Sequence, residues 1–229
     1  MFRVTIEKFL RLMVSQRGVE VNPDKIQAIM ELALPKTVKE VQSLNSKVAA
    51  LNRFVLKATD KCLSFFRTLK KSFEWTTKCQ QAFEDLKAYL SSLSLLSPSK
   101  LGEALFLYLI VSFATVNAAL VREGNEVQKP IYFISRAFQK AEERYLPMEK
   151  LAFTLVTAAR KLKPYFQAHT VIFLIDKPIR RAMSSLEATG RMTLWVIELS
   201  EFDIQYQPRM AIKEQVIADF ITEFTLAKD

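Results

Sequence analysis

The order of apolar segments in the second half of the chain constrains its fold more than any other feature. Three apolar runs of strand length, residues 105–111, 114–121 and 129–134, follow one another, and Gly124-Asn125 is a turn signal between the last two. A long helical pattern over 141–166 comes next. This order predicts a sheet that begins with three consecutive strands and is then covered by a helix.

The remaining segments continue the alternation of strands and helices. The sequence TVIFLI at 170–175 has the composition of a buried strand, and a further strand is expected at 203–206. Helices are expected after Pro178, over 191–202 and over 211–224. The order β-β-β-α-β-α-α-β-α predicts an α/β domain with a mixed five-stranded sheet flanked by helices.

The first half of the chain predicts a short hairpin followed by helices. Residues 9–14 and 19–21 flank a turn that contains Gly18. Helix starts are indicated by Asn22-Pro23, by the capping box from Thr37, by Thr59 or Asp60, and by a second capping box from Thr77. The apolar face of the helix from Thr37 continues through Leu51 and Val55. The helix from Thr59 or Asp60 is expected to reach Leu69, and the helix from Thr77 is expected to end at about Leu90. The Ser- and Pro-rich residues 91–101 are interpreted as a linker.

Positive charge is concentrated in the first half. The chain of 229 residues has 33 Lys and Arg against 24 Asp and Glu, a net charge of +9. Residues 1–100 hold 17 Lys and Arg and 9 Asp and Glu, a net charge of +8. Residues 101–229 hold 16 Lys and Arg and 15 Asp and Glu, a net charge of +1. A basic excess of this kind favours a polyanionic partner for the first half.

Rare residues exclude several classes of protein. The 4 Gly form no phosphate-binding loop, and 1 His disfavours zinc sites and Ser-His-Asp triads. The 2 Cys, Cys62 and Cys79, are expected to be buried or half-buried thiols in a reducing, intracellular setting, cytoplasm or nucleus. No apolar run is long enough for a membrane span, and no secretory signal is apparent at the N-terminus.

Several segments resemble one known family. They are FLRLMVSQRGVEVNPDKIQAIMEL, PKTVKEVQSLNSKVAALNRFV, FEWTTKCQQAFEDLKAYL, KPIYFISRAFQKAEERYLPMEKLAF, ARKLKPYFQAHTVIFLIDKPI and IELSEFDIQYQPR with VIADFI, and they cover nearly all of residues 9–224. The chain resembles part of the Pol polyprotein of gypsy-class LTR retrotransposons. By this resemblance, residues 1–95 are similar to the palm edge and thumb of a reverse transcriptase, and residues 100–226 to its RNase H-like domain.

The resemblance also shows which polymerase features are missing. The family carries an Asp-Asp motif on the palm, and no Asp-Asp pair occurs in this chain. The primer-grip triplet of the family is Phe-Leu-Gly, whereas Phe9-Leu10-Arg11 stands here. Polymerase activity of this chain alone is therefore not expected.

The resemblance implies an acidic site for Mg²⁺, because RNase H chemistry uses two divalent cations held by carboxylates. The helix Glu of the family is matched by Glu149, the strand-end Asp by Asp176, and the last Asp by Asp219. The first Asp, however, is matched by Ile110, and the acid that follows it by Phe113. Glu103 lies seven residues upstream of Ile110 and is too far along the strand to replace the missing ligand. The site is therefore expected to bind Mg²⁺ weakly or not at all.

The basic residues of the helical half are candidates for contact with nucleic-acid phosphates, and a solvated helix face is the alternative. These candidates are Lys39, Lys47, Arg53, Lys57, Lys61, Arg67, Lys70 and Lys71. The expected partners are an RNA/DNA template-primer duplex and the remainder of Pol, with palm and fingers upstream and a second RNase H downstream.

Three hypotheses for the function follow. The first is a catalytically degenerate RNase H-like connection module that holds a template-primer duplex. The second is an active, metal-dependent RNase H that cleaves the RNA of hybrids. The third is a retroelement remnant without function, or a protein-interaction module. The absence of one of four carboxylates favours the first.

Overall fold

The computed structural model of the chain describes residues 6–9, 12–15, 18–68, 74–93, 95–124, 127–175, 179, 183 and 190–208. The chain divides into two compact units, Met1–Pro98 and Ser99–Asp229. None of the helices within the described ranges combines the length and hydropathy needed to cross a bilayer.

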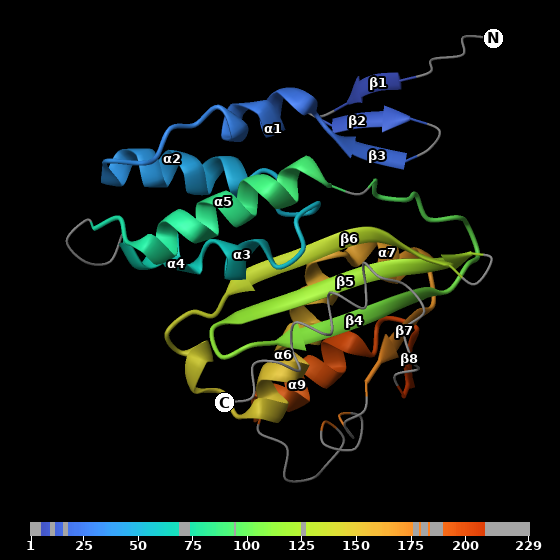
Figure 1. The fold of residues 1–229 in the computed structure, drawn as a ribbon. Coiled ribbons are helices and arrows are strands. Elements are labelled where there is room, and N and C mark those ends of the chain that lie inside the picture. Colours follow the sequence, from blue (N-terminus) through green and yellow to red (C-terminus); the bar gives the residue numbers. More distant parts are fainter. Residues whose placement is uncertain are drawn as a thin grey trace. The chain divides into compact units, whose positions relative to one another are not determined.

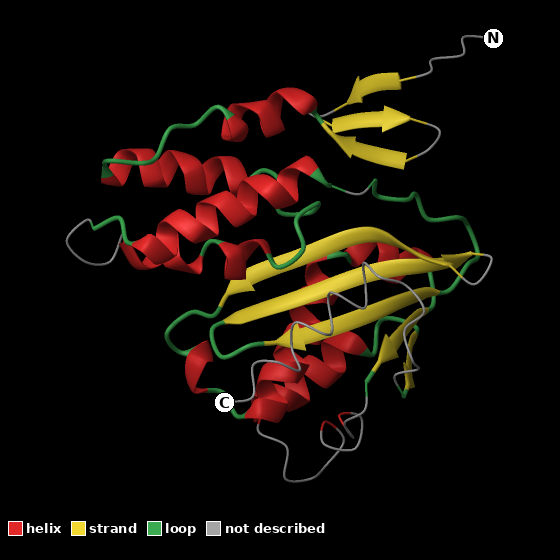
Figure 2. Ribbon diagram, in the orientation of Figure 1, coloured by secondary structure: helices red, strands yellow, loops and turns green. Residues whose placement is uncertain are grey.

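A small antiparallel sheet opens the first unit (Figure 2). It consists of β1 (Ile6–Phe9), β2 (Leu12–Ser15) and β3 (Gly18–Val21), paired in that order. The predicted hairpin around Gly18 is confirmed as β2 and β3. Strand β1 was not predicted, because Glu7 and Lys8 interrupt its apolar pattern.

Residues predicted to be a linker close this sheet. Leu96 is buried and forms an antiparallel bridge with Val19, in which the Val19 N–H donates to the Leu96 carbonyl at 2.9 Å and the Leu96 N–H donates back at 3.2 Å. Gly18 lies beside this bridge with a φ of +146°. A Cβ at position 18 would lie 2.1 Å from the Leu96 carbonyl oxygen, so only glycine fits there.

Five helices follow within the described residues of the first unit, and three of them begin at or beside predicted caps. They are α1 (Pro23–Met30), α2 (Val38–Ala49), α3 (Ala58–Lys61), α4 (Leu63–Thr68) and α5 (Thr77–Ser91). The side chains of Asn22 and Thr37 accept from backbone N–H groups in the first turns of α1 and α2. The cap of α5 is Thr76 and not Thr77, because the Thr76 hydroxyl accepts the Cys79 N–H.

Two helix predictions in this unit need correction. The helix from Thr37 ends at Ala49, and Leu51 and Val55 are buried in the turns that follow it. The predicted helix through Leu69 is two short helices, α3 and α4, and α3 follows a residue with a left-handed backbone, Lys57 (φ 52°). The apolar spacing thus fixed which residues are buried but not where the helix ends.

An aromatic cluster and two thiols lie in the helical core. Phe65 stacks on Trp75 at 5.6 Å between ring centroids, and Phe83 meets both rings edge-on. Cys62 and Cys79 are buried free thiols, as predicted. Burial raises the pKa of the Cys62 thiol to about 12, so it stays protonated at neutral pH.

The second unit contains a mixed five-stranded sheet, which confirms the predicted fold class. Its strands are β4 (Leu105–Val111), β5 (Thr115–Gly124), β6 (Val127–Ala137), β7 (Val171–Leu174) and β8 (Ile204–Gln207). Their order in the sheet is β6-β5-β4-β7-β8 (Figure 1). The first three strands are antiparallel, and β7 and β8 continue in parallel beside β4.

Helices cover one face of this sheet. They are α6 (Pro147–Lys161), α7 (Lys163–Ala168) and α9 (Gly190–Leu199), and the 3₁₀ helix η1 (Glu142–Arg144) precedes them. The single helix predicted over 141–166 is therefore three segments, because Pro147 and Pro164 start new helices. The helices expected after Pro178 and over 211–224 lie outside the described residues, apart from single residues of the first.

The core of this unit lies between the helices and one face of the sheet. Side chains that alternate along β4, Leu105, Leu107 and Leu109, pack against the apolar face of α6, including Leu155 and Ala159. The intervening residues of β4, Tyr108 and Ile110 among them, belong to the other sheet face and are also buried. Strand β4 is therefore buried on both faces.

We predict that Gly18→Ala destabilises the protein by about 2 kcal/mol or more, because the new methyl group would collide with a backbone oxygen and φ is positive. Gly190→Ala is the control, since nothing lies within 4 Å of a Cβ there; its change should stay within about 1 kcal/mol. Urea unfolding followed by circular dichroism measures both. If both substitutions changed the free energy of unfolding equally, the bridge between Val19 and Leu96 would not stabilise the β1-β2-β3 sheet.

Candidate functional site

A row of side chains crosses the sheet at the position where the resemblance places the first catalytic acid. Ile110 of β4 pairs with Asn117 of β5, and Asn117 pairs with Ser135 of β6, so the three side chains share one face. All three are buried, with Ile110 4% exposed. The row contains no ionisable side chain.

The polar members of this row are joined by hydrogen bonds. The Ser135 hydroxyl donates to Asn117 Oδ1 at 2.7 Å, and Asn117 Nδ2 donates to the Thr115 hydroxyl at 3.1 Å. The last member of this hydrogen-bond network is Ser112, whose Oγ lies 2.6 Å from Thr115 Oγ1. A buried neutral network of this kind is stable because its groups are partnered.

Glu149 lies at the N-terminus of α6 and is 7% exposed. Its Oε2 accepts the Leu146 N–H at 3.0 Å, which caps the helix, and its Oε1 lies 3.5 Å from a guanidinium nitrogen of Arg191 on α9. α6 packs on the sheet face opposite the one that carries Ile110.

The described residues do not fit a two-metal centre. Asp176 and Asp219 lie outside them, and among the residues that the structure describes no three His, Cys, Asp or Glu side chains are grouped for a cation. Ile110 offers no ligand, and Glu149 is already bound to a backbone N–H and an arginine.

Three cations lie over aromatic rings around the start of α6. Arg191 lies 4.3 Å from the ring centroid of Tyr145, Arg136 lies 4.9 Å from Phe153, and Lys150 lies 5.0 Å from Phe138 and 5.5 Å from Phe113. The rings also contact one another, Tyr145 with Phe153 and Phe153 with Phe138. We call these seven residues the cation–aromatic cluster: Phe113, Arg136, Phe138, Tyr145, Lys150, Phe153 and Arg191.

In the two ion pairs of this cluster, the acidic side chain is less exposed than its arginine partner. The side chain of Arg191 is 46% exposed and that of its partner Glu149 only 9%. Arg136 is 31% exposed, whereas its partner Glu142, at 2.6 Å, is 12% exposed. The carboxylates are therefore more deeply buried than the guanidinium groups, and the more exposed member of each pair is positive.

The predicted cations of the first unit differ in their surroundings. Lys39 is exposed on α2, whereas the Lys47 ammonium donates to the Ala28 carbonyl of α1 at 3.1 Å. Arg53 and Lys61 lie over the rings of Phe54 and Tyr89, at 5.4 and 4.6 Å. Lys57 is buried. The side chain of Arg67, together with Lys70 and Lys71, lies outside the described residues.

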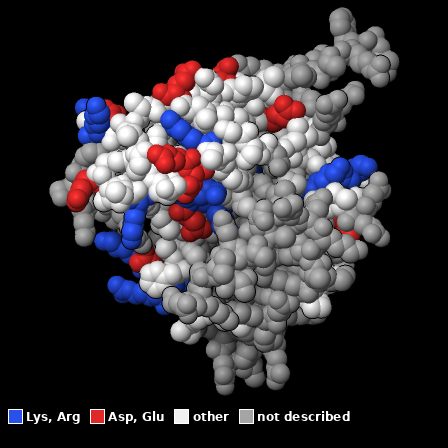
Figure 3. Space-filling view, in the orientation of Figure 1, with Lys and Arg blue, Asp and Glu red and all other residues white. Residues whose placement is uncertain are grey.

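Lys87, which the sequence did not single out, has a structural role in the first unit. Its ammonium donates to the carbonyls of Met30 and Leu32, both at 2.8 Å, at the C-terminal end of α1. Figure 3 shows blue and red side chains interspersed on the visible face of this unit. The basic excess does not form a field of a single sign on that face.

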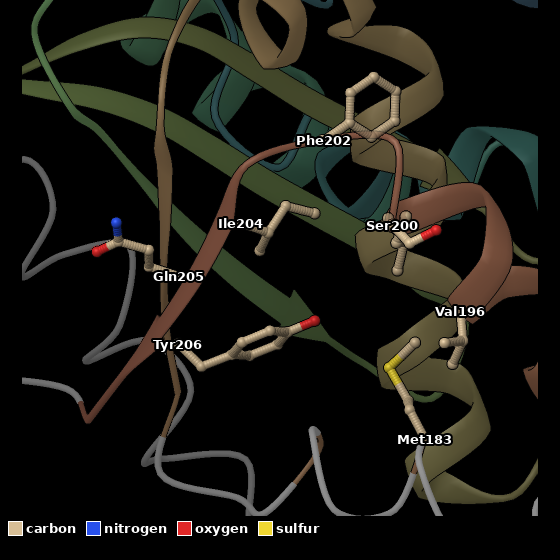
Figure 4. A pocket seen from close by; sticks show the side chains of 8 residues that line it. Met183, Val196, Ser200, Phe202, Ile204, Gln205 and Tyr206 are labelled. Atoms are coloured by element: carbon tan, nitrogen blue, oxygen red, sulfur yellow. The ribbon is translucent and has the colours of Figure 1, made fainter.

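A cavity of about 520 Å³ lies between α9 and β8 (Figure 4). Among the described residues that line it, only Tyr206 is titratable, and the others are Met183, Val196, Leu199, Ser200, Phe202, Ile204 and Gln205. Such a lining fits packing and not hydrolysis.

A second hollow, of about 490 Å³, contains His169, Glu103 and Asp203. Arg122 donates to both carboxylate oxygens of Glu103, and His169 Nδ1 lies 3.0 Å from the Glu103 carbonyl oxygen. Burial acts to raise the pKa of Glu103, but the hydrogen bonds from Arg122 and from the Lys100 N–H outweigh it and leave the pKa below its ordinary value. These residues lie where β4, β7 and β8 begin, far along β4 from Ile110.

Part of the chain matches the model of a known family. Residues 75–173 match the model of the RNase H-like domain found in reverse transcriptase. The match begins at Trp75, ahead of α5, and ends within β7. Residues 75–173 are therefore similar to the RNase H-like domain of a reverse transcriptase.

The chain as a whole is similar to retrotransposon Pol polyproteins, as the sequence motifs predicted. It is 24% identical over 96% of its length to the Pol polyprotein from transposon opus of Drosophila melanogaster, and 26% identical over 96% to that from transposon 297. The transposon Tf2-3 polyprotein of Schizosaccharomyces pombe is 22% identical over 89%. The chain spans 23%, 21% and 16% of these relatives, respectively.

Solved structures with the same fold are foamy viral protease-reverse transcriptases. One in complex with double-stranded DNA is 20% identical, with a TM-score of 0.73 over 93% of this chain and 46% of that chain. Another, in complex with an RNA/DNA hybrid, is 19% identical, with a TM-score of 0.73 over 92% of this chain and 30% of that chain.

We predict that Ile110→Asp destabilises the protein by about 3 kcal/mol or more, because it removes a buried apolar side chain and places a carboxyl group beside a completed neutral network. Ile110→Val is the control and should lose about 1 kcal/mol. Urea unfolding with and without Mg²⁺ tests the site as well as the fold. If Mg²⁺ restored the free energy of unfolding of the Ile110→Asp variant, the other metal ligands would be in place, which would contradict our interpretation.

Proposed function

We propose that the chain is a catalytically degenerate RNase H-like connection module of a retrotransposon reverse transcriptase, which binds an RNA/DNA template-primer duplex without cleaving it. The proposal rests on one observation: the apolar residue Ile110 is buried at the position that the resemblance gives to the first metal-binding acid. Its neighbours on the same face of the sheet are Asn117 and Ser135, which are also buried and carry no charge. Loss of a shared carboxylate ligand removes the means of holding two cations together.

The contacts of the Glu149 carboxylate also support a module that does not cleave RNA. Its carboxylate caps α6 and faces Arg191, so a divalent cation would have to displace a guanidinium group to reach it. Asp176 and Asp219 alone would supply two ligands, too few for the paired-metal arrangement.

Binding of a duplex is proposed from charge and from similarity. The first unit, residues 1–95 in the thumb-like assignment, carries most of the net charge of +9, and Lys39 is an exposed cation on it. Foamy viral reverse transcriptases of the same fold have been solved with double-stranded DNA and with an RNA/DNA hybrid. Palm and fingers, and a second RNase H, are the proposed neighbours within Pol.

We predict that the purified chain binds a fluorescein-labelled RNA/DNA hybrid and leaves its RNA strand intact in the presence of Mg²⁺ or Mn²⁺. Because phosphate contacts release counterions, affinity should fall at least about tenfold between roughly 50 and 200 mM salt. Fluorescence anisotropy measures binding, and gel electrophoresis of the labelled RNA detects cleavage.

The outcomes separate the three hypotheses. Cleavage that is lost in Asp176→Asn would establish an active RNase H and contradict the proposal. Absence of any salt-dependent binding would favour a remnant without function or a protein-interaction module. Binding without cleavage, unchanged in Asp176→Asn, supports the connection module.

A further inference from the structure

We infer that the cation–aromatic cluster at the start of α6 is a phosphate-backbone contact of the second unit: Arg191, Lys150 and Arg136 hold phosphates, and the ring of Phe113 packs against the adjoining nucleotide. The inference rests on the proposed function, and it locates part of the binding surface in the half of the chain whose net charge is only +1.

The arrangement of the arginines carries the argument. Glu149 and Glu142 lie under Arg191 and Arg136, and each also accepts a backbone N–H, from Leu146 and Gln139. The carboxylates are therefore fixed in place and hold the guanidinium groups without covering them. A guanidinium group supported from beneath keeps free N–H directions for a phosphate and loses little side-chain freedom on binding.

The aromatic rings orient the same cations. Tyr145 lies under Arg191, Phe153 under Arg136, and Phe138 beside Lys150. Arg191 thus has an ion-pair partner and a ring partner, which together restrict its position. The cluster is preformed, and preformed contacts bind more tightly than mobile surface lysines.

Phe113 is the exposed part of the cluster. Its side chain is 88% exposed at the tip of the β4–β5 turn. The turn is rigid, because the Ser112 hydroxyl accepts the N–H groups of Ala114 and Thr115, and the Ala114 carbonyl accepts the Phe138 N–H. A large ring held in water by a rigid turn and flanked by an ammonium group suits packing against a sugar and base.

Charge favours nucleic acid over a protein partner for this surface. The most exposed groups that flank the rings are cations, and the acids of the cluster region that pair with them are the buried members. The neighbouring Lys140 and Arg144 are exposed, against one exposed acid, Glu143, in the same stretch. A polyanion is the partner that such a rim attracts.

The test measures hybrid binding by fluorescence anisotropy for the full chain at several salt concentrations. We expect Arg191→Ala to weaken binding about tenfold and to lower the salt dependence by about one phosphate contact. Phe113→Ala, at an exposed position that does not endanger folding, should weaken binding about fivefold or more.

Arg160→Ala is the matched control. Arg160 pairs with Glu198 across the same two helices, α6 and α9, at 2.7 Å, with its side chain 56% exposed and no part in the cluster. Its removal deletes the same charge and the same kind of ion pair, and it should change affinity by less than about twofold. Thermal unfolding of each variant reports whether the fold is retained.

Three results would overturn the inference. If the wild-type chain binds the hybrid and Phe113→Ala, Lys150→Ala and Arg191→Ala bind as Arg160→Ala does, binding lies elsewhere, and the proposed function survives without this surface. If those variants leave hybrid binding unchanged but shift sedimentation velocity, the surface is a protein contact. Absence of hybrid binding by the wild-type chain removes both proposals.

Discussion

The position of β4 at the centre of the second sheet governs what this domain can do. The strand pairs antiparallel with β5 and parallel with β7, and both of its faces are buried. Every side chain on it must therefore be apolar or fully hydrogen-bonded, because an isolated buried carboxylate carries a large desolvation penalty. A nuclease offsets that penalty with bound cations. Here Ile110 avoids the penalty, and the hydrogen-bonded neighbours Asn117 and Ser135 complete the row without charge.

Carboxylates near the start of α6 illustrate the same constraint. Glu142 and Glu149 are buried acids, and each is stabilised by one backbone N–H and one arginine. Breaking such a pair would leave an unpaired buried charge, which is strongly unfavourable. These acids therefore have roles in the local structure: they accept backbone N–H groups at the starts of η1 and α6, and they fix two arginines at the surface. An acid retained in the sequence is not by itself a metal ligand, and its partners decide its role.

Much of the fold could be predicted from the sequence, because it depends on local patterns. The apolar runs predicted β4 to β7, the strand expected at 203–206 is β8, and Asn22 and Thr37 marked helix starts correctly. The errors have physical causes. Pro147 and Pro164 divided one predicted helix, Glu7 and Lys8 concealed β1, and the Ser-rich linker contained Leu96, which is held by a backbone bridge that no side chain signals.

Contacts at the candidate site could not be predicted, because they join residues far apart in the chain. The sequence placed Glu149 on a helix, but its pairing with Arg191 depends on how α6 and α9 cross. Phe113 was noticed only as the replacement of an acid, and its exposure follows from the Ser112 turn. Lys47 and Lys87 were visible as cations, yet their bonds to α1 carbonyls arise from helix packing.

Net charge is thus a poor guide to where the proposed contacts with a polyanion lie on this chain. The first half holds +8, but Lys47, Lys61 and Arg53 each contact a carbonyl or a ring, and Lys57 is buried. The second half sums to +1, yet in the two ion pairs at the start of α6 the acids are more deeply buried than the arginines. A phosphate approaching from water is attracted by the outer layer far more than by a buried carboxylate that is already paired. The depth of each charge, which the sequence does not contain, therefore outweighs the count when a binding surface is assigned.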